Sequence, residues 1–182
     1  MGRFLEGIER EEKEYMIKLL IDRIKKHRNP VKYWRDLGVS IGEKCEIFSS
    51  ASLGGEPYLV SIGNKVRITS NVVFITHDGG VWVYRNMYPE LSDIDLFGRI
   101  RIGNNVHIGN NAVIMPGVTV GDNVIIGVGA IVTHDIPSNT IAAGVPARPI
   151  ESLTEYLDKH KEDFVHTFAL SSEEKKRVLK DL

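Results

Sequence analysis

Hydrophobic positions in the middle of the chain recur every six residues. A helix repeats near 3.6 residues and a strand near 2, so neither element alone accounts for this spacing. The fifth residue of each hexad lies two before the first residue of the next, so in an extended strand both side chains point the same way. Glycine, asparagine and aspartate fill the places between and favour turns. The pattern therefore predicts short strands joined by corners. First places are held by Ile102, Ile108, Ile114, Val120, Ile126 and Val132, and fifth places by Val106, Ala112, Val118, Val124 and Ala130.

A period of six with these residue types predicts a parallel β-helix, whose stacked coils bury one another's inward side chains. The rhythm begins at Ile41-Gly42, where Cys45 takes an inward place that predicts a buried thiol. A local insertion, Gly54-Gly55-Glu56-Pro57, disturbs it, and it ends near Pro146–Pro149. Residues 75–99 interrupt the hexads altogether. Long irregular excursions from a rigid scaffold usually carry function, so we expect the site there.

Both ends of the chain have helical patterns. Apolar residues at helical spacing predict an amphipathic helix over residues 8–28, and two capping boxes predict short helices near the other end. We expect these segments to cover the open ends and edges of the coil. The predicted division is a helical segment at 1–39, a β-helix at 40–150 and a helical tail at 151–182. The residues that carry these predictions are Ile17, Leu20, Ile21 and Ile24 in the first helix, with Ser152, Glu155, Ser171 and Glu174 in the boxes.

Composition narrows the choice of partners. Lysine plus arginine number 23 and aspartate plus glutamate 24, which argues against nucleic acid or an anionic membrane as partner. The single cysteine excludes an internal disulfide and agrees with a reducing compartment. Acidic residues stand at the start where a signal peptide needs an apolar run, and no segment has the length of a membrane span. We therefore expect a cytoplasmic protein with a small partner.

Several motifs on this rhythm resemble those of the hexapeptide-repeat acyltransferases. They are "VVFITHDGG", then the excursion, then "PGVTVGDN", "THDIP" and "GVPAR". The chain is similar to the maltose and galactoside acetyltransferases, the xenobiotic acetyltransferases, and the sugar O-acetyltransferases of capsule and O-antigen synthesis. This resemblance covers about residues 40–150. It implies a left-handed parallel β-helix, acetyl-CoA as co-substrate, no metal, and a homotrimer with a site at each of its three interfaces.

The resemblance also implies a mechanism centred on His77. In the family, the matching histidine takes the proton from an acceptor hydroxyl or amine as that atom attacks the thioester of acetyl-CoA. Imidazole has an unperturbed pKa near 6.5, so it can accept a proton at neutral pH. Asp78 either orients this histidine or only begins the turn that follows. A sugar or polysaccharide-precursor hydroxyl is the favoured acceptor. An amino-sugar nitrogen on a nucleotide-linked sugar, or an antibiotic, is the alternative.

Other site residues follow from matching motif positions. Three of them depart from the family: Asp78 replaces a common proline, His107 a tryptophan, and His134 a lysine or arginine. The aromatic residues of the excursion can bind a sugar ring or pack on a neighbouring subunit. The resemblance implies acceptor contacts from Trp82, Tyr84, Arg85 and His107, and cofactor contacts from Gly109, Asn110, Gly127, Val128, Thr133, His134 and Arg148.

Two functions outside this class also fit a β-helix. A zinc-dependent carbonic anhydrase uses the same coil with three histidine ligands, and this chain has His77, His107 and His134 on the repeat. It lacks that family's closely spaced histidine pair, which disfavours a metal site. A non-catalytic scaffold or ice-binding coil would show regular threonine ladders, which are absent from the sequence.

Overall fold

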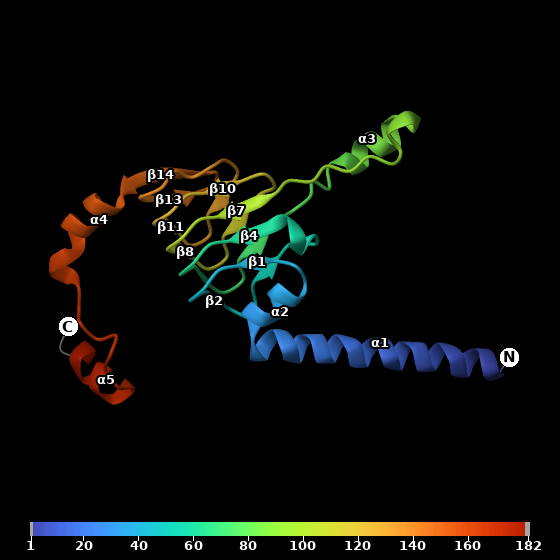
Figure 1. Ribbon diagram of the computed structural model, residues 1–182, viewed down its shortest axis with the longest axis horizontal. Helices are drawn as coiled ribbons and strands as arrows, with labels where there is room; N and C mark the ends of the chain where they lie inside the picture. The colour runs from blue at the N-terminus through green and yellow to red at the C-terminus, as the bar shows by residue number, and fades with distance from the viewer. Residues whose placement is uncertain (1, 181–182) are drawn as a thin grey trace.

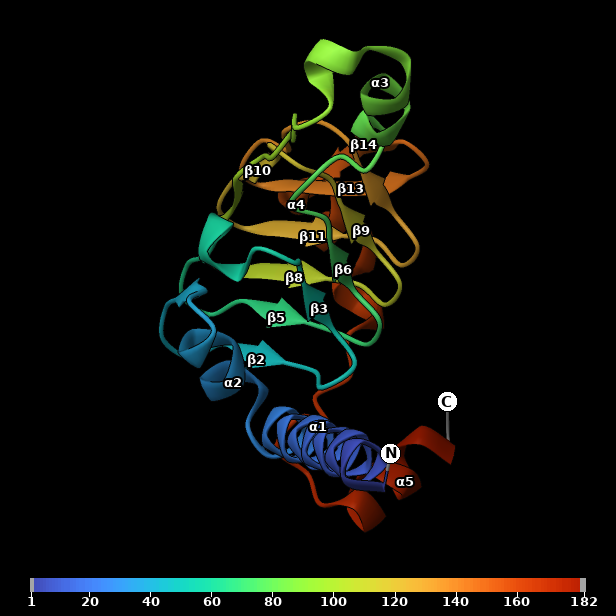
Figure 2. The same cartoon turned by 90° about the vertical axis from the view of Figure 1, so that its right-hand side faces the viewer.

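The hexads fold into three sheets of parallel strands that form the sides of a coil, and one of the three sheets ends in an added antiparallel strand (Figures 1 and 2). The computed structural model describes residues 2–180, with the side chains of the first helix described from residue 13 onward. One four-stranded sheet, sheet A, contains β1 (Ser40–Ile41), β4 (Val60–Ile62), β7 (Ile100–Ile102) and β10 (Thr119–Val120). Sheet B contains β2 (Glu46–Ile47), β5 (Arg67–Ile68), β8 (Val106–Ile108), β11 (Val124–Ile126), β13 (Thr140–Gly144) and β14 (Ala147–Ser152). Sheet C contains β3 (Ser52–Leu53), β6 (Val73–Phe74), β9 (Val113–Ile114) and β12 (Ile131–Val132).

The inward positions of the hexads form one continuous apolar core. All the first-place residues from Ile102 to Val132 and the fifth-place residues from Val106 to Ala130 are buried, so that prediction is confirmed, whereas Ile41 in the first coil is only partly buried. The coils stack in register: Ile102 pairs with Ile62 on one side and Val120 on the other. Cys45 departs from its prediction, because it packs against this core but is only partly buried in the first coil. The core is therefore built by stacking, with each coil covering the next.

Asparagine residues explain how the corners turn. Asn105, Asn123 and Asn139 have positive φ angles of 54°, 54° and 62°, a conformation that asparagine tolerates better than most residues. Their side chains also bond in a column, because the Asn105 amide donates to Asn123 Oδ1 and the Asn123 amide donates to Asn139 Oδ1, both at 2.9 Å. The polar places of the hexad thus shape the corners and tie successive coils together.

Residues 75–99, which we call the arm, leave the coil after β6 and return at β7. The two limbs meet near the coil in an antiparallel bridge between His77 and Phe97. Beyond it lie α3 (Val81–Met87) and a 3-10 turn, η2 (Pro89–Leu91). Figure 1 shows α3 held well away from the coil. The sequence predicted only an irregular excursion, whereas the arm carries a short helix near its tip.

The N-terminal helices cover the coil differently from the prediction. The first, α1, runs over Gly2–Arg28 and starts before the predicted residue 8; α2 (Pro30–Asp36) was not predicted. Trp34 of α2 is buried in the core, so α2 covers the first coil. The expectation that α1 covers this end of the coil is wrong, because α2 covers the first coil and α1 projects sideways from it (Figure 1). Its four predicted apolar residues, Ile17, Leu20, Ile21 and Ile24, are 45–58% exposed.

At the other end, β14 turns back antiparallel to β13 and closes the last coil. Beyond it come α4 (Leu153–His160), the turn η3 (Lys161–Asp163) and α5 (Ser172–Lys180). Both predicted capping boxes are confirmed: Ser152 accepts from the Glu155 amide at 3.1 Å, and Ser171 accepts from the Glu174 amide at 3.3 Å. Across residues 2–180, no helix combines the length and the apolar character that spanning a membrane requires.

Candidate active site

A pocket of about 530 Å³ lies where the chain turns from sheet C toward sheet A. Three successive coils supply its walls, through the residues that follow β6, β9 and β12, and the returning limb of the arm closes one side. Its lining is mostly apolar, with a few polar side chains among them. The lining residues are Ile75, His77, Asp78, Gly79, Leu96, Phe97, Gly98, Met115, Pro116, Gly117 and Thr133. The pocket therefore brings together His77 and Thr133, which the sequence assigned to catalysis and to cofactor binding.

His77 is held at the base of the arm. Its side chain is 50% exposed, so it can meet a ligand. The ring packs edge-on against Phe97, with centroids 6.2 Å apart and planes at 74°. Its Nδ1 atom lies 3.0 Å from Oε2 of Glu56, a residue from the preceding coil. The imidazole is thus fixed on two sides and open toward the pocket that it lines.

Glu56 is the residue that sequence reasoning missed. It precedes the turn η1 (Pro57–Leu59), inside the insertion that disturbs the hexads. Its carboxylate accepts a 2.5 Å hydrogen bond from the hydroxyl of Thr76, which is fully buried. The bond from Thr76, and secondarily the one with His77, lower the pKa of Glu56 below its ordinary value. A carboxylate is therefore present beside the imidazole at neutral pH.

Asp78 takes the second of its two predicted roles. Its Oδ1 accepts a hydrogen bond of 2.8 Å from the backbone N–H of Gly80. This is the local turn that the Asp-Gly-Gly sequence favours. The carboxylate that contacts His77 is that of Glu56, so the structure gives Asp78 no orienting contact with the ring.

The outer face of sheet C begins at this pocket and is apolar over three of its four strands. In every strand of the sheet the second residue points into the core and the first points outward, and in β3 that outward residue is the polar Ser52. Val73, Val113 and Ile131 therefore form an outward row, in register across three coils. The corresponding outward row on sheet A is polar, with Ser61, Arg101 and Thr119 in register.

Four of the predicted cofactor residues lie across sheet C from His77. Gly109 and Asn110 follow β8, and Gly127 and Val128 follow β11, so both pairs form the corner between sheets B and C. At Gly109 an added Cβ would lie 2.8 Å from the backbone nitrogen of Val128, so only glycine lets these coils approach. Val128 itself is 72% exposed at this corner. Sheet C is thus bordered by the pocket on one edge and by these residues on the other.

The remaining cofactor predictions lie at separate places. Thr133 lines the pocket, and its Oγ1 lies 2.8 Å from Nδ1 of His134, which points outward beside it. Arg148 is exposed on β14 in the last coil, where it donates to the carbonyl of Ala147 at 2.8 Å. These positions run from the pocket toward the C-terminal end of the coil.

His107 lies on the outer face of sheet B, which is the side opposite the corner that holds His77. It borders a separate hollow of about 360 Å³ together with Lys65 and Arg67. Burial, and then the nearby charge of Arg67, lower the pKa of His107 below its ordinary value. The structure therefore does not bring His107 to the His77 pocket of the same chain.

The predicted acceptor residues of the excursion are also remote from this pocket. Trp82 and Tyr84 lie on α3 and are 68% and 54% exposed, and Tyr84 stacks on Tyr88 with centroids 6.5 Å apart. Arg85 donates to the carbonyl of Ile94 at 2.7 Å and pairs with Asp95, so it joins the two limbs of the arm. None of these residues lines the pocket around His77.

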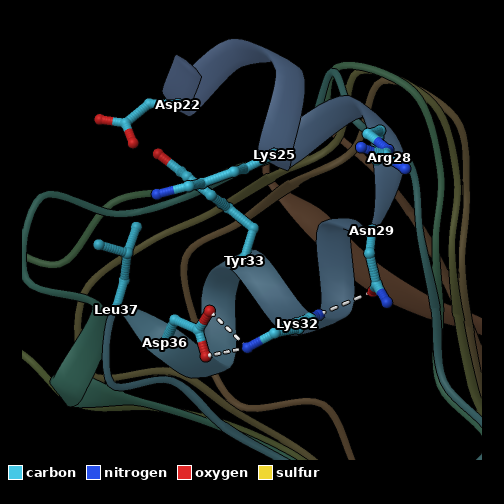
Figure 3. Close-up of a pocket in the computed structure, with 8 residues that line it drawn as sticks. All are labelled: Asp22, Lys25, Arg28, Asn29, Lys32, Tyr33, Asp36 and Leu37. Carbon is cyan, nitrogen blue, oxygen red and sulfur yellow. Dashed lines mark hydrogen bonds and ion pairs between the residues drawn. The ribbon is translucent and has the colours of Figure 1, made fainter. Parts of the chain in front are cut away.

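A further hollow, of about 420 Å³, lies between α1 and α2 (Figure 3). Its polar groups already serve the helices: Lys32 pairs with Asp36 at 2.8 Å, and Asn29 caps α2 by accepting from the Lys32 amide at 2.9 Å. We assign no ligand to it. Its lining residues are Asp22, Lys25, Arg28, Asn29, Lys32, Tyr33, Asp36 and Leu37.

Metal-ligating side chains do not gather in the described part of the chain. No group of three or more histidine, cysteine, aspartate or glutamate side chains there is placed to hold a metal ion. Of the three histidines considered for zinc, His77 lines the pocket and His134 lies beside Thr133 at its edge. His107 lies on the outer face of sheet B. The carbonic-anhydrase alternative therefore has no ligand set among these residues.

Comparison with known proteins agrees with this architecture. A family model described as bacterial transferase hexapeptide (six repeats) matches residues 99–134. The chain is 48% identical over 166 residues to Protein CapG of Staphylococcus aureus. The matched region covers 90% of this chain and 94% of that protein. It is 44% identical over 105 residues to galactoside O-acetyltransferase of Escherichia coli K12, where the match covers 58% of this chain and 49% of that protein.

A solved structure extends the similarity to three dimensions. A galactoside acetyltransferase in complex with coenzyme A superposes with a TM-score of 0.56 at 26% identity, covering 88% of this chain and 90% of the other. The predicted fold class, a left-handed parallel β-helix with terminal helices, is confirmed. The repeat pattern, the fold and the sequence identity over most of the chain all indicate the same family. The chain therefore belongs to the hexapeptide-repeat acetyltransferases.

Proposed function

We propose that this chain transfers an acetyl group from acetyl-CoA to a sugar hydroxyl, with His77 as the general base. The observation that best supports this proposal is the half-exposed imidazole of His77, which lines a pocket of about 530 Å³ and is hydrogen-bonded to the carboxylate of Glu56. The similarity to a galactoside O-acetyltransferase supports the sugar acceptor, and the related structure with coenzyme A supports the co-substrate. Because acetyl-CoA is made inside the cell, we place the reaction in the cytoplasm.

The chemistry needs no enzyme-bound intermediate, because a thioester is already activated. The acceptor oxygen attacks the thioester carbonyl while the imidazole of His77 takes the hydroxyl proton. The tetrahedral intermediate then collapses, the carbon–sulfur bond breaks, and CoA leaves as a thiol after receiving a proton from the imidazolium. Positioning of both substrates in the pocket supplies much of the remaining acceleration. The partly buried Cys45, in the first coil, takes no part in this mechanism.

We propose that the pantetheine of acetyl-CoA lies along the outer face of sheet C. The apolar row of Val73, Val113 and Ile131 suits its hydrocarbon atoms, and the face ends at the His77 pocket. At the other edge, Gly109, Asn110, Gly127 and Val128 would offer backbone groups to its amides. Thr133 and His134 would border the thioester end, and Arg148 would meet the phosphates, for which a guanidinium is well suited.

We further propose a homotrimer whose sites form between copies. In one chain His107 and His77 occupy opposite sides of the coil, so both can border one acceptor site only if a second copy supplies one of them. The arm supports the same proposal, because α3 projects beyond the coil (Figure 1) and the aromatic residues that it carries are exposed. Trp82 and Tyr84 would then pack on, or bind the acceptor beside, another copy.

A test of the activity measures CoA release from acetyl-CoA with a panel of sugars, nucleotide-linked amino sugars and antibiotics. We expect turnover with a sugar hydroxyl, and expect His77→Ala to lower kcat by roughly 10²- to 10⁴-fold, the usual worth of a general base. The matched control is His166→Ala, which removes an exposed histidine in the tail. Near-normal turnover of His77→Ala would refute the mechanism, and turnover with only an amine would move the chain to N-acetylation.

A further inference from the structure

The insertion that disturbs the early hexads lies directly beneath the catalytic corner. Residues one regular coil apart differ by 18 in number, as Asn105 and Asn123 do. Around the insertion the spacing is 21: Leu53 pairs with Phe74, and Glu56 reaches His77 over the same interval. Glu56 is therefore the residue that stacks below His77 when the register of β3 and β6 is continued.

Gly54 allows the insertion to take this path. It has a φ of +90°, in the region that favours glycine, and an added Cβ would lie 2.6 Å from Cγ2 of Thr76. A side chain at this position would therefore be strained by its backbone and would push Thr76 away. Gly55 leaves more room, since its added Cβ would lie 3.6 Å from the ring of His77.

Thr76 fixes Glu56 at two points. Its hydroxyl accepts from the Glu56 backbone N–H at 3.2 Å and donates to Glu56 Oε2 at 2.5 Å. Thr76 is fully buried, so this hydroxyl cannot turn to solvent instead. The carboxylate is thus held in one place before any substrate arrives, at 3.0 Å from Nδ1 of His77.

We propose that Glu56, held by Thr76, is a positioning residue that keeps the proton of neutral His77 on Nδ1 and leaves Nε2 as the basic nitrogen. An ionised carboxylate can only accept hydrogen bonds, so the ring must donate to it from Nδ1. The same carboxylate balances the positive charge that the ring gains when Nε2 takes the acceptor's proton. This inference rests on the proposed function, and it assigns Glu56 and Thr76 roles that act through His77.

The test uses the full chain and begins with a readout that does not need turnover. In ¹⁵N NMR of the histidine rings, with His77 assigned from His77→Gln, wild type should show the neutral ring protonated on Nδ1. Glu56→Ala should shift the ring toward the Nε2-protonated form, and Glu43→Gln, which removes a carboxylate from the first coil, should change nothing. An unchanged tautomer in Glu56→Ala would overturn the proposal.

Kinetics then separate positioning from a merely structural role. We expect Glu56→Gln to lower kcat by about 10- to 100-fold, part of the worth of the general base, and to leave KM for acetyl-CoA within about twofold. In a His77→Ala background the same substitution should have no further effect on kcat, because its action runs through the ring. Thr76→Val, which removes the hydroxyl, should also lower kcat. Thr76→Ser, which keeps the hydroxyl, should have a kcat close to that of wild type.

The outcomes distinguish this inference from the proposed function. If His77→Ala is inactive while Glu56→Gln keeps wild-type kcat, Glu56 only anchors the insertion and the general base stands. If Glu56→Gln lowers kcat equally with and without His77, its effect is structural and the inference fails. If His77→Ala keeps full activity, the proposed function itself fails, whatever the tautomer.

Discussion

The coil and the arm treat their apolar side chains in opposite ways. Every first-place hexad residue from Ile102 to Val132 is at most 4% exposed, whereas Trp82, Met87 and Val83 of the arm are 55–68% exposed. The coil completes its own core within one chain, because each turn covers its neighbour. Within residues 2–180 the arm has no such covering neighbour, and the described apolar side chains of α1 from Ile17 to Ile24 are exposed in the same way. The stability of the folded chain therefore comes mainly from the coil. The arm and α1 can bury these exposed apolar side chains only against another molecule.

The largest effect should come from breaking the coil core. Ile108 is fully buried, so Ile108→Ala should lower the free energy of unfolding by about 2–5 kcal/mol through lost burial and a cavity. Val83→Ala on the arm is the matched control, since a surface change should stay within about 0.5 kcal/mol. Urea unfolding at one fixed protein concentration measures both. Equal losses at the two positions would contradict the contrast between coil and arm.

A second prediction sharpens the role of the arm. If its aromatic surface packs on another copy, Trp82→Ser combined with Met87→Ser should weaken assembly by about 2 kcal/mol or more, or roughly 30-fold in the dissociation constant. Sedimentation over a range of protein concentrations measures this, with circular dichroism as a check that the coil is intact. Glu90→Gln on the same arm removes no apolar area and should leave assembly unchanged. A double variant that assembles like wild type would show that the arm meets no copy.

The smallest effect concerns Glu56, where the insertion joins the coil to the site. The fold lowers its pKa, so the carboxylate contributes stability above its unfolded pKa of about 4.3, and this contribution is lost as pH falls through the folded pKa. Glu56→Gln should therefore cost on the order of 1 kcal/mol at neutral pH and progressively less in acid. Urea unfolding of both proteins from about pH 7 down to pH 3 measures the difference. A cost that does not shrink in acid would mean that charge plays no part.

Much of the molecule follows from local spacing. The hexads predicted the buried positions, and the capping boxes predicted where α4 and α5 begin, because both depend on residues a few places apart. The dyad of His77 and Glu56 joins residues 21 apart. Its signal was the three-residue lengthening of one coil, which becomes informative only when the register of β3 and β6 is followed into the insertion. Asp78 was the nearer candidate in sequence, but its carboxylate is already used by the turn.

The sequence by itself determined the period and the inward residues and indicated the motif around His77, since each is a property of a short segment. Only the tertiary structure decided that Glu56 contacts His77, that α2 rather than α1 covers the first coil, and that His107 lies on the far side from the pocket. The physical reason is that stacking brings together residues whole coils apart. Which of these residues contact one another depends on the number of residues in every intervening coil. A pattern within a short segment does not show which residue of the next coil will lie against it.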